Sequence, residues 1–285
     1  MQVDEPVLLP RLSRVAVCGG THGNELSGVY LVREMLKTEK RKEVGEPASV
    51  LMVLSNPRAM QQCSRYVDTD LNRCFTHATL NGPISEGAPY EIFRARELNA
   101  LLGPKGSRAA VDLICDLHNT TANMGLCFIA YSDCDWICLH IFRYLQMPDT
   151  PARFIHFDLS TKESYSLDSI GKHGFAMEIG PQPHGCVKSN VYTAMKEGVQ
   201  HMQDWVRCFN SGESNVSMAQ LPVCSTISKK KKHILIDTFI AVIAHGVFFL
   251  AKARNNYYII LFQFYFNFCV RTVKLWYFYL SPCPS

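Results

Sequence analysis

The 285-residue sequence lacks the features that would direct it out of the cell. Met1–Pro10 includes Asp4 and Glu5 and has no apolar run of the ~7–15 residues that a signal peptide needs. None of the twelve cysteines forms a Cys-x-x-Cys pair, and Cys18 and Cys115 lie within apolar runs, where a free thiol acts as a small buried side chain. We therefore expect reduced cysteines and a cytoplasmic protein.

Acidic residues and glycines are scarce in the C-terminal part of the sequence. Residues 225–285 hold eight lysines and arginines against one acid, Asp237, and 14 of the 31 aromatic residues but one of the 17 glycines. The first 224 residues have 21 basic and 24 acidic side chains, a mildly acidic balance that argues against a nucleic-acid partner. The change in composition predicts a globular domain followed by a tail of different character.

Short apolar runs alternate with amphipathic segments along the first 210 residues. Apolar residues at helical spacing predict helices that begin near Leu26 and that cover 91–102, 136–145 and 189–209. The apolar runs predict strands over 14–18, 49–54, 111–117, 126–131 and 174–179. Alternation of this kind predicts an α/β fold with a largely parallel sheet and helices on both faces. Ligands of such folds bind at the carboxyl ends of the strands.

Two histidines and a glutamate follow predicted strands. His22 and Glu25 lie three residues apart in a glycine-rich segment after the first strand, and His118 ends the third. Imidazole and carboxylate groups at this spacing suit zinc, and Asp116 or a backbone carbonyl could orient a ligating ring. The alternative is that His22 and Glu25 form a surface or capping pair.

Eight sequence blocks then show a family resemblance over about residues 12–213. The blocks are GGTHGNELSGVYLV, NPRAM, RYVDTDLNR, PYE, RARELN, LLGPK, DLHNTTANMG and EIGPQPHG. In this order they resemble the aspartoacylase family of zinc amidohydrolases, which are relatives of the zinc carboxypeptidases. Within the family, the sequence is more similar to the branch that acts on N-acyl aromatic L-amino acids than to aspartoacylase itself. The resemblance implies a zinc-carboxypeptidase-like, mixed and largely parallel sheet.

The resemblance also implies the metal ligands and the catalytic base. His22, Glu25 and His118 match the family's ligands for one zinc ion per chain, and Glu178 matches its general base. A carboxylate beside apolar Met177 is costly unless it has a partner, so a purely structural role for Glu178 is disfavoured.

Four further residues match the family's substrate contacts. Arg65 corresponds to the arginine that polarises the scissile carbonyl, Asn72 and Arg73 to the pair that binds the α-carboxylate, and Tyr165 to a substrate-binding position. An arginine with a neighbouring amide suits a carboxylate. The alternatives are a solvated surface position for Arg65 and an ion pair between Arg73 and Asp68 or Asp70.

Asp168 bears on the choice of substrate. Ten residues before its catalytic glutamate, aspartoacylase has an arginine that binds the second carboxylate of N-acetylaspartate; here that position is Asp168. A carboxylate there would repel a second carboxylate, so the resemblance implies small N-acyl aromatic amino acids and acylated cysteine conjugates as substrates. The alternative is that Asp168 caps the following turn.

We expect two parts, an amidohydrolase domain over 1–213 and a basic, aromatic tail over 214–285 in place of the family's C-terminal β domain. The tail combines Lys229–Lys232 with apolar runs over 234–250 and 257–270, which allow association with the membrane periphery or a failure to fold. Self-association of the chain is left open. An amidohydrolase is the leading function; the alternatives are a truncated or membrane-tethered form that binds zinc without turnover, and a peptide carboxypeptidase.

Overall fold

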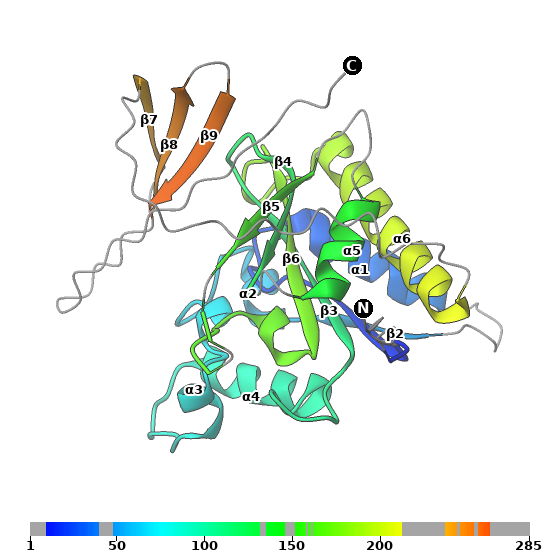
Figure 1. Cartoon of the computed structure of the whole chain (residues 1–285). Coiled ribbons are helices and arrows are strands. Elements are labelled where there is room, and N and C mark those ends of the chain that lie inside the picture. The colour runs from blue at the N-terminus through cyan, green and yellow to red at the C-terminus, as the bar shows by residue number, and fades with distance from the viewer. Residues whose placement is uncertain are drawn as a thin grey trace, which may run out of the picture. The chain divides into compact units, whose positions relative to one another are not determined.

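The computed structural model describes residues 10–39, 48–131, 135–145, 152–157, 159–160 and 162–212, and the backbone of three strands between 237 and 262. The chain divides into two compact units, residues 1–216 and 217–285. Figure 1 labels most of the helices and strands of both units.

Six strands of the first unit form one mixed sheet in the order β2–β1–β3–β6–β4–β5 (Figure 1). Strands β2, β1, β3 and β6 run parallel to one another; β4 is antiparallel to β6 and parallel to β5. The bounds are β1 (Arg14–Gly19), β2 (Ser49–Leu54), β3 (Leu113–Asn119), β4 (Gly125–Ala130), β5 (Arg153–His156) and β6 (His173–Gly180). The predicted mixed, largely parallel sheet is confirmed.

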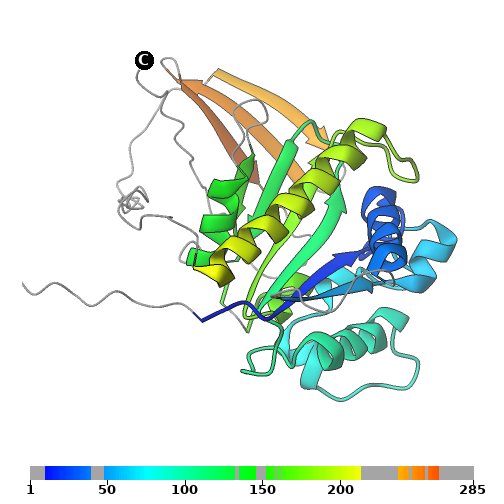
Figure 2. The same ribbon diagram turned by 90° about the vertical axis from the view of Figure 1, so that its right-hand side faces the viewer.

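Helices cover both faces of this sheet, as the sequence predicts. One face packs against α1 (Leu26–Glu39), α5 (Trp136–Tyr144) and α6 (Ser189–Ser211), and α6 runs along the strands (Figure 2). The other face packs against α4 (Tyr90–Leu102) and the short helices η1 (Leu71–Arg73), α3 (His77–Asn81) and η2 (Leu167–Ile170). A further short helix, α2 (Pro57–Gln62), follows β2.

Strand β3 divides its side chains between the two hydrophobic clusters. Leu113, Cys115 and Leu117 pack in the cluster beneath α1, α5 and α6, whereas Ile114 packs in the cluster beneath α4. Residues two apart in a strand share a face, so His118 projects from the same face as Ile114. Asp116 and His118 therefore lie on the face that η1 and η2 cover.

The third strand lies two residues later than the predicted range 111–117. The Val111 N–H donates to the carbonyl oxygen of Leu102 at 2.8 Å, outside the sheet, whereas Asn119 still pairs with Ile179 of β6. Polar residues can extend this strand because their neighbours in β6 continue the ladder. As a result, His118 lies inside the strand rather than beyond it.

The second unit is described here by its backbone. Strands β7 (Asp237–Ile243), β8 (Gly246–Ala253) and β9 (Asn256–Phe262) form an antiparallel sheet in chain order. Residues 213–236, which include Lys229–Lys232, lie outside the described residues. The domain boundary after residue 213 and the membrane association of the tail stay predictions. In the part of the chain that the structure describes, no helix has the length and apolar character needed to cross a membrane.

Candidate metal centre

The loop after β1 positions His22 and Glu25. Gly20 has a φ of +75°, a backbone conformation that glycine adopts without steric cost. A Cβ atom on Gly23 would lie 2.1 Å from the carbonyl carbon of Ala59, so the loop passes too close to α2 for any side chain at that position. The tight turn directs both functional side chains inward, where His22 is 4% and Glu25 3% exposed.

Strands β3 and β6 supply His118 and Glu178 as neighbours. These two residues are register partners in the parallel pair β3–β6, so their side chains leave the same face of the sheet. His118 is 2% exposed, and Glu178 is partly exposed. The carboxyl ends of three adjacent strands thus place a glutamate beside the two histidines.

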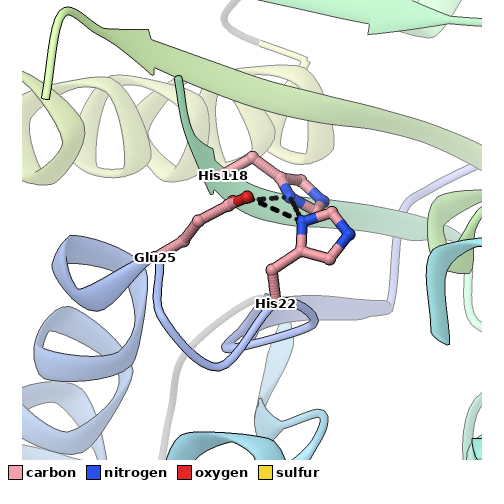
Figure 3. Close-up of side chains that lie close together, drawn as sticks. All are labelled: His22, Glu25 and His118. Carbon is pink, nitrogen blue, oxygen red and sulfur yellow. Dashed lines mark hydrogen bonds and ion pairs between the residues drawn. The ribbon is translucent and has the colours of Figure 1, made fainter. Parts of the chain in front are cut away.

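His22, Glu25 and His118 converge on one point (Figure 3). Nδ1 of His22 lies 2.7 Å from one carboxylate oxygen of Glu25, and Nδ1 of His118 lies 2.9 Å from the other. The two Nδ1 atoms are 3.2 Å apart. One ligand atom from each residue lies within 4.8 Å of the others, so the three side chains could bind a single metal ion.

Two aspartates hold the opposite ring nitrogens. Nε2 of His22 lies 3.0 Å from Asp70, and Nε2 of His118 lies 2.8 Å from Asp116. Asp116 in turn accepts a hydrogen bond from the Thr21 hydroxyl at 2.7 Å. A carboxylate at Nε2 fixes the proton on that nitrogen and leaves the Nδ1 lone pair for a metal. The structure therefore identifies Asp116 as the group that orients His118.

The charges of the site fit a divalent cation. Glu25, Asp70 and Asp116 surround the histidines; Arg65 pairs with Glu25 and Asp70, and the positive charge of Arg73 also acts on Asp70. Burial alone would lower the pKa of His22 and of His118, but the nearby carboxylates outweigh burial and raise both. Burial would likewise raise the pKa of Glu25, yet the two histidines hold it well below its usual range. A bound dication would replace these protons as the balancing positive charge.

Glu178 has the environment of a proton acceptor near neutral pH. Burial raises the pKa of its carboxyl group to about 7, and the negative charge of Glu25 adds to this effect. A base whose pKa lies close to the working pH transfers protons efficiently. The predicted role of Glu178 thus agrees with its surroundings.

Arg65 reaches the centre from the segment that follows α2. Its guanidinium donates to Asp70 through Nε at 3.2 Å and Nη2 at 3.0 Å, and through Nη1 to Glu25 at 3.4 Å. The Arg65 side chain is 39% exposed, so one part faces the buried carboxylates and another faces solvent. A fixed guanidinium at the edge of the site can donate to a substrate oxygen.

Asn72 lies beside His118, and Arg73 connects Asn72 with Tyr165. The Asn72 side-chain nitrogen is 3.5 Å from Nε2 of His118, and its oxygen accepts from the Leu167 N–H at 2.9 Å. The Arg73 guanidinium lies 4.7 Å from the centre of the Tyr165 ring. The structure thus brings the predicted carboxylate-binding pair next to the predicted metal ligands.

Asp168, the predicted determinant of substrate choice, is as buried as the three residues of the cluster, with 3% of the residue exposed. It lies in η2, where the Ser166 hydroxyl donates to its carboxylate. Burial raises the pKa of Asp168 to about 6. The carboxylate is enclosed by its own segment, and its predicted effect on a substrate stays a prediction.

Sequence analysis missed the structural roles of two acids. Asp70 was considered only as a partner of Arg73, whereas it holds both His22 and Arg65. Glu91, which is fully buried, accepts hydrogen bonds from the backbone N–H groups of residues 67, 68 and 69 at 2.7–3.1 Å and so shapes the loop before Asp70. Both acids lie in blocks that carry the family resemblance, but spacing alone does not show which partner each one has.

Comparisons with known proteins agree with this geometry. The family model described as the succinylglutamate desuccinylase/aspartoacylase catalytic domain matches residues 11–206. The N-acyl-aromatic-L-amino acid amidohydrolase (carboxylate-forming) B of Danio rerio is 56% identical over 209 residues, which cover 72% of this chain and 67% of that protein. The enzyme of the same name from Homo sapiens, without the letter B, is 46% identical over 209 residues, which cover 73% and 65%.

A solved structure shows the same fold. The crystal structure of murine aminoacylase 3 matches with a TM-score of 0.67 and 43% sequence identity, over 72% of this chain and 67% of that one. The chain therefore spans about two thirds of the length of the relatives it matches.

Proposed function

The chain belongs to the succinylglutamate desuccinylase/aspartoacylase family, and from this membership we propose that it hydrolyses the amide bond of N-acyl aromatic L-amino acids. The products are a carboxylate and a free amino acid, and acylated cysteine conjugates are included among the substrates. The observation that carries the proposal is the His22–Glu25–His118 cluster with Glu178 on the adjacent strand. The names of two relatives, 56% and 46% identical, support this substrate class.

We propose one zinc ion per chain, held by the two Nδ1 atoms and the Glu25 carboxylate. Two nitrogens and a carboxylate are a ligand set of catalytic zinc sites, which leave a position for water. When bound, zinc supplies a water of lowered pKa and polarises a carbonyl oxygen.

The residues around the cluster then have separate tasks. The Glu178 carboxylate accepts a proton from the attacking water and returns it to the departing amine nitrogen. Arg65 donates to the scissile carbonyl oxygen as negative charge develops there. A guanidinium has five N–H donors, and the contacts to Asp70 and Glu25 use three of them.

Asn72 and Arg73 are proposed to bind the substrate's α-carboxylate. Asn72 is held in place by the Leu167 N–H, and the Arg73 Nη1 atom donates to the Asn72 carbonyl oxygen at 2.9 Å. Tyr165 stacks on Arg73 and offers an aromatic surface for the substrate side chain. These contacts would orient the amide bond toward Glu178.

One alternative has a specific observation behind it. The matched region covers 67% of the Danio rerio relative and 65% of the human relative, so a form that binds zinc without turnover is the competing function.

A cytoplasmic location is also proposed, because the eight cysteines that the structure describes are unpaired. Membrane association and self-association remain predictions.

Metal analysis and turnover on the purified chain test the proposal. We expect one zinc equivalent per chain and faster hydrolysis of N-acetyl-L-tyrosine than of N-acetyl-L-aspartate. The His118→Ala variant should lose most of the zinc, and His201→Ala, a partly exposed histidine in α6, should keep it. Full zinc retention by His118→Ala would show that the ligand assignment is wrong. Zinc binding without turnover would favour the competing function.

A further inference from the structure

Lys105 places its ammonium group among four oxygen atoms. Nζ lies 2.8 Å from the carbonyl oxygen of Phe75, 2.6 Å and 2.8 Å from the carbonyl and hydroxyl oxygens of Ser164, and 2.8 Å from the Ser169 hydroxyl. Lysine side chains usually extend into solvent, but Lys105 is partly buried. Three N–H donors directed at so many acceptors indicate a fixed ammonium group rather than a mobile surface charge.

The four oxygens belong to two segments that are separate in sequence. Residues 70–76, which we call the η1 segment, include Asn72, Arg73 and Phe75. Residues 164–170, which we call the η2 segment, include Tyr165 and Asp168. Each proposed substrate-binding residue other than Arg65 therefore lies in one of the two segments that Lys105 joins.

The two segments also contact each other directly. The Phe75 N–H donates to the Tyr165 carbonyl oxygen at 3.1 Å, and the Leu167 N–H donates to the Asn72 side chain at 2.9 Å. Asn72 in turn lies 3.5 Å from His118. A displacement of one segment would thus be passed to the proposed carboxylate-binding pair, while the three side chains of the cluster keep their own partners.

Lys105 comes from a third element, which anchors it. It follows the end of α4, where its own N–H donates to the Asn99 side chain at 2.8 Å. The buried Leu98 and Leu102 of α4 pack in the hydrophobic cluster on this face of the sheet. The ammonium group is therefore held from outside the two segments.

We propose that Lys105 is a positioning residue of the active site, which ties the η1 segment to the η2 segment and so sets the distance between the carboxylate-binding pair and Tyr165. This inference rests on the proposed function. It accounts for a lysine rather than an arginine, because a compact ammonium can donate to oxygens on several sides, whereas a guanidinium donates within a plane. Burial lowers the pKa of Lys105 to about 8 and the negative charge of Asp168 opposes this, so the group is mostly protonated at pH 7.

Steady-state kinetics of Lys105→Met test the inference. Methionine keeps most of the apolar stem but cannot donate, so the segments should separate while zinc binding continues. With N-acetyl-L-tyrosine we expect KM to rise about tenfold or more and kcat to fall by less than about threefold, because substrate positioning is lost and the base is kept. Zinc per chain should stay at the wild-type value.

The control is Lys172→Met, which removes an ammonium that pairs with Asp112 at 2.7 Å near the start of β3. It should lower the unfolding temperature without changing KM. Ser169→Ala is a milder change, which removes one acceptor of Lys105 and should raise KM about two- to fivefold even if Lys105→Met fails to fold. Lys105→Arg should restore KM only in part.

The outcomes separate the inference from the proposed function. Unchanged KM in Lys105→Met or, if that variant does not fold, in Ser169→Ala would overturn the positioning role. So would an equal rise in KM for Lys172→Met. A wild-type chain that neither hydrolyses nor binds N-acyl amino acids would overturn the proposed function and this inference together. Wild-type turnover with an unaffected variant would overturn the inference alone.

Discussion

The two histidines of the metal centre differ from surface histidines in what holds their second nitrogen. Asp70 and Asp116 bind the Nε2 atoms, so each ring has one orientation and one nitrogen left for a metal. Without such a partner the ring could rotate, and ordering it on metal binding would make the free energy of binding less favourable. We therefore expect side chains outside the proposed ligand set to contribute to metal affinity.

Asp116→Asn should weaken zinc binding. Asparagine keeps the shape but removes the charge that fixes the His118 proton, so we expect the zinc dissociation constant to rise about 10–100-fold, as is typical for such partners. The control is Asp112→Asn just before β3, where the lost contacts are to Lys172 and to the backbone of residues 13 and 14. Competition with a chelator measures both. An equal rise of the zinc dissociation constant in both variants would show that the weaker binding comes from a general loss of stability.

Glu178→Gln should keep zinc and lose turnover. The amide preserves the size of the side chain but cannot accept a proton, so kcat should fall about 100-fold or more, the usual contribution of a general base. Glu197→Gln, at an exposed position in α6, is the matched control and should keep the wild-type kcat. Near-normal kcat in Glu178→Gln would assign the base to another residue.

The same carboxyl group sets a limit on pH. Because the pKa of Glu178 is raised to about 7, the group is protonated below that pH and cannot act as a base. A bound dication stabilises the carboxylate and lowers this pKa, so the acid limb of kcat/KM should lie at or below pH 7, with about a tenfold fall per pH unit. A pH profile of the zinc-loaded chain measures it. A limb centred above pH 8 would contradict the assignment.

Asp168 is the residue on which the predicted substrate choice depends. We expect kcat/KM to be higher for N-acetyl-L-tyrosine than for N-acetyl-L-aspartate, and Asp168→Arg to narrow the gap if the side chain acts on the substrate. Because Asp168 is buried, Asp168→Asn is needed beside it to separate charge from folding. Faster hydrolysis of N-acetyl-L-aspartate by the wild-type chain would overturn the prediction.

At the scale of elements, the sequence predicts the long helices and the central strands well. The range 49–54 agrees with β2, and 189–209 differs from α6 by two residues at its end. The elements that were missed are short. Helices α2 and α3 each depend on a cap, Asn56 and Thr76 respectively, and η2 depends on contacts made after folding. Apolar periodicity over three to six residues cannot reveal such turns.

The candidate site was predictable where chemistry and position coincide. Two histidines and a glutamate at strand ends indicate a metal site from sequence alone, because parallel strands bring their ends together. The partners of these residues were not predictable in the same way. Asp70 reaches His22 across 48 positions, and Lys105 reaches Ser164 across 59. Contacts of that length follow from the packing of η1, η2 and α4, which no local pattern encodes.

The loop between β1 and α1 should tolerate no side chain at Gly23. A Cβ atom would meet backbone atoms of Ala59 and Met60 at 2.1–2.3 Å, so α2 or the loop must move and carry His22 and Glu25 with it. Gly23→Ala should therefore weaken zinc binding about tenfold or more, in the range seen when a ligand's support is lost. Isothermal titration with zinc measures this.

Gly87→Ala, in the segment before α4, is the control for the Gly23→Ala variant. Its φ is +78°, with no other atoms within 4 Å of an added Cβ, so the expected cost is about 1–2 kcal/mol of conformational strain and no loss of zinc affinity. If Gly23→Ala bound zinc as the wild type does, the close approach of the loop to α2 would not be what positions the ligands.

At the scale of the whole molecule, the residues of the candidate metal centre lie in the first unit. The proposed ligands His22, Glu25 and His118 and the partners Asp70 and Asp116 all lie within residues 1–216. The composition of residues 225–285 predicts a separate part, and the backbone strands β7, β8 and β9 lie within it. Composition does not predict the function of that part, since aromatic and basic residues are compatible with a sheet, a membrane surface or self-association.

The final prediction concerns the activity of this chain relative to a longer relative. The matched region covers 67% of the Danio rerio protein, and we expect residues 214–285 not to replace the C-terminal β domain that the family resemblance implies. Zinc per chain should be complete, because the ligands are present. Turnover per bound zinc should be at least about tenfold below that of a chimera in which the relative's C-terminal third replaces residues 214–285, since a less enclosed site admits water and positions substrate poorly.

The measurement combines zinc content, kcat/KM and the fraction of each protein that sediments with phospholipid vesicles. If residues 214–285 do not cover the apolar surface of the first unit, this chain should sediment more than the chimera, because exposed apolar patches favour association. We expect this chain to have both the lower turnover per bound zinc and the larger sedimenting fraction. Equal turnover per zinc and equal sedimentation would show that residues 214–285 are harmless and that the relative's C-terminal part is dispensable for the proposed hydrolysis.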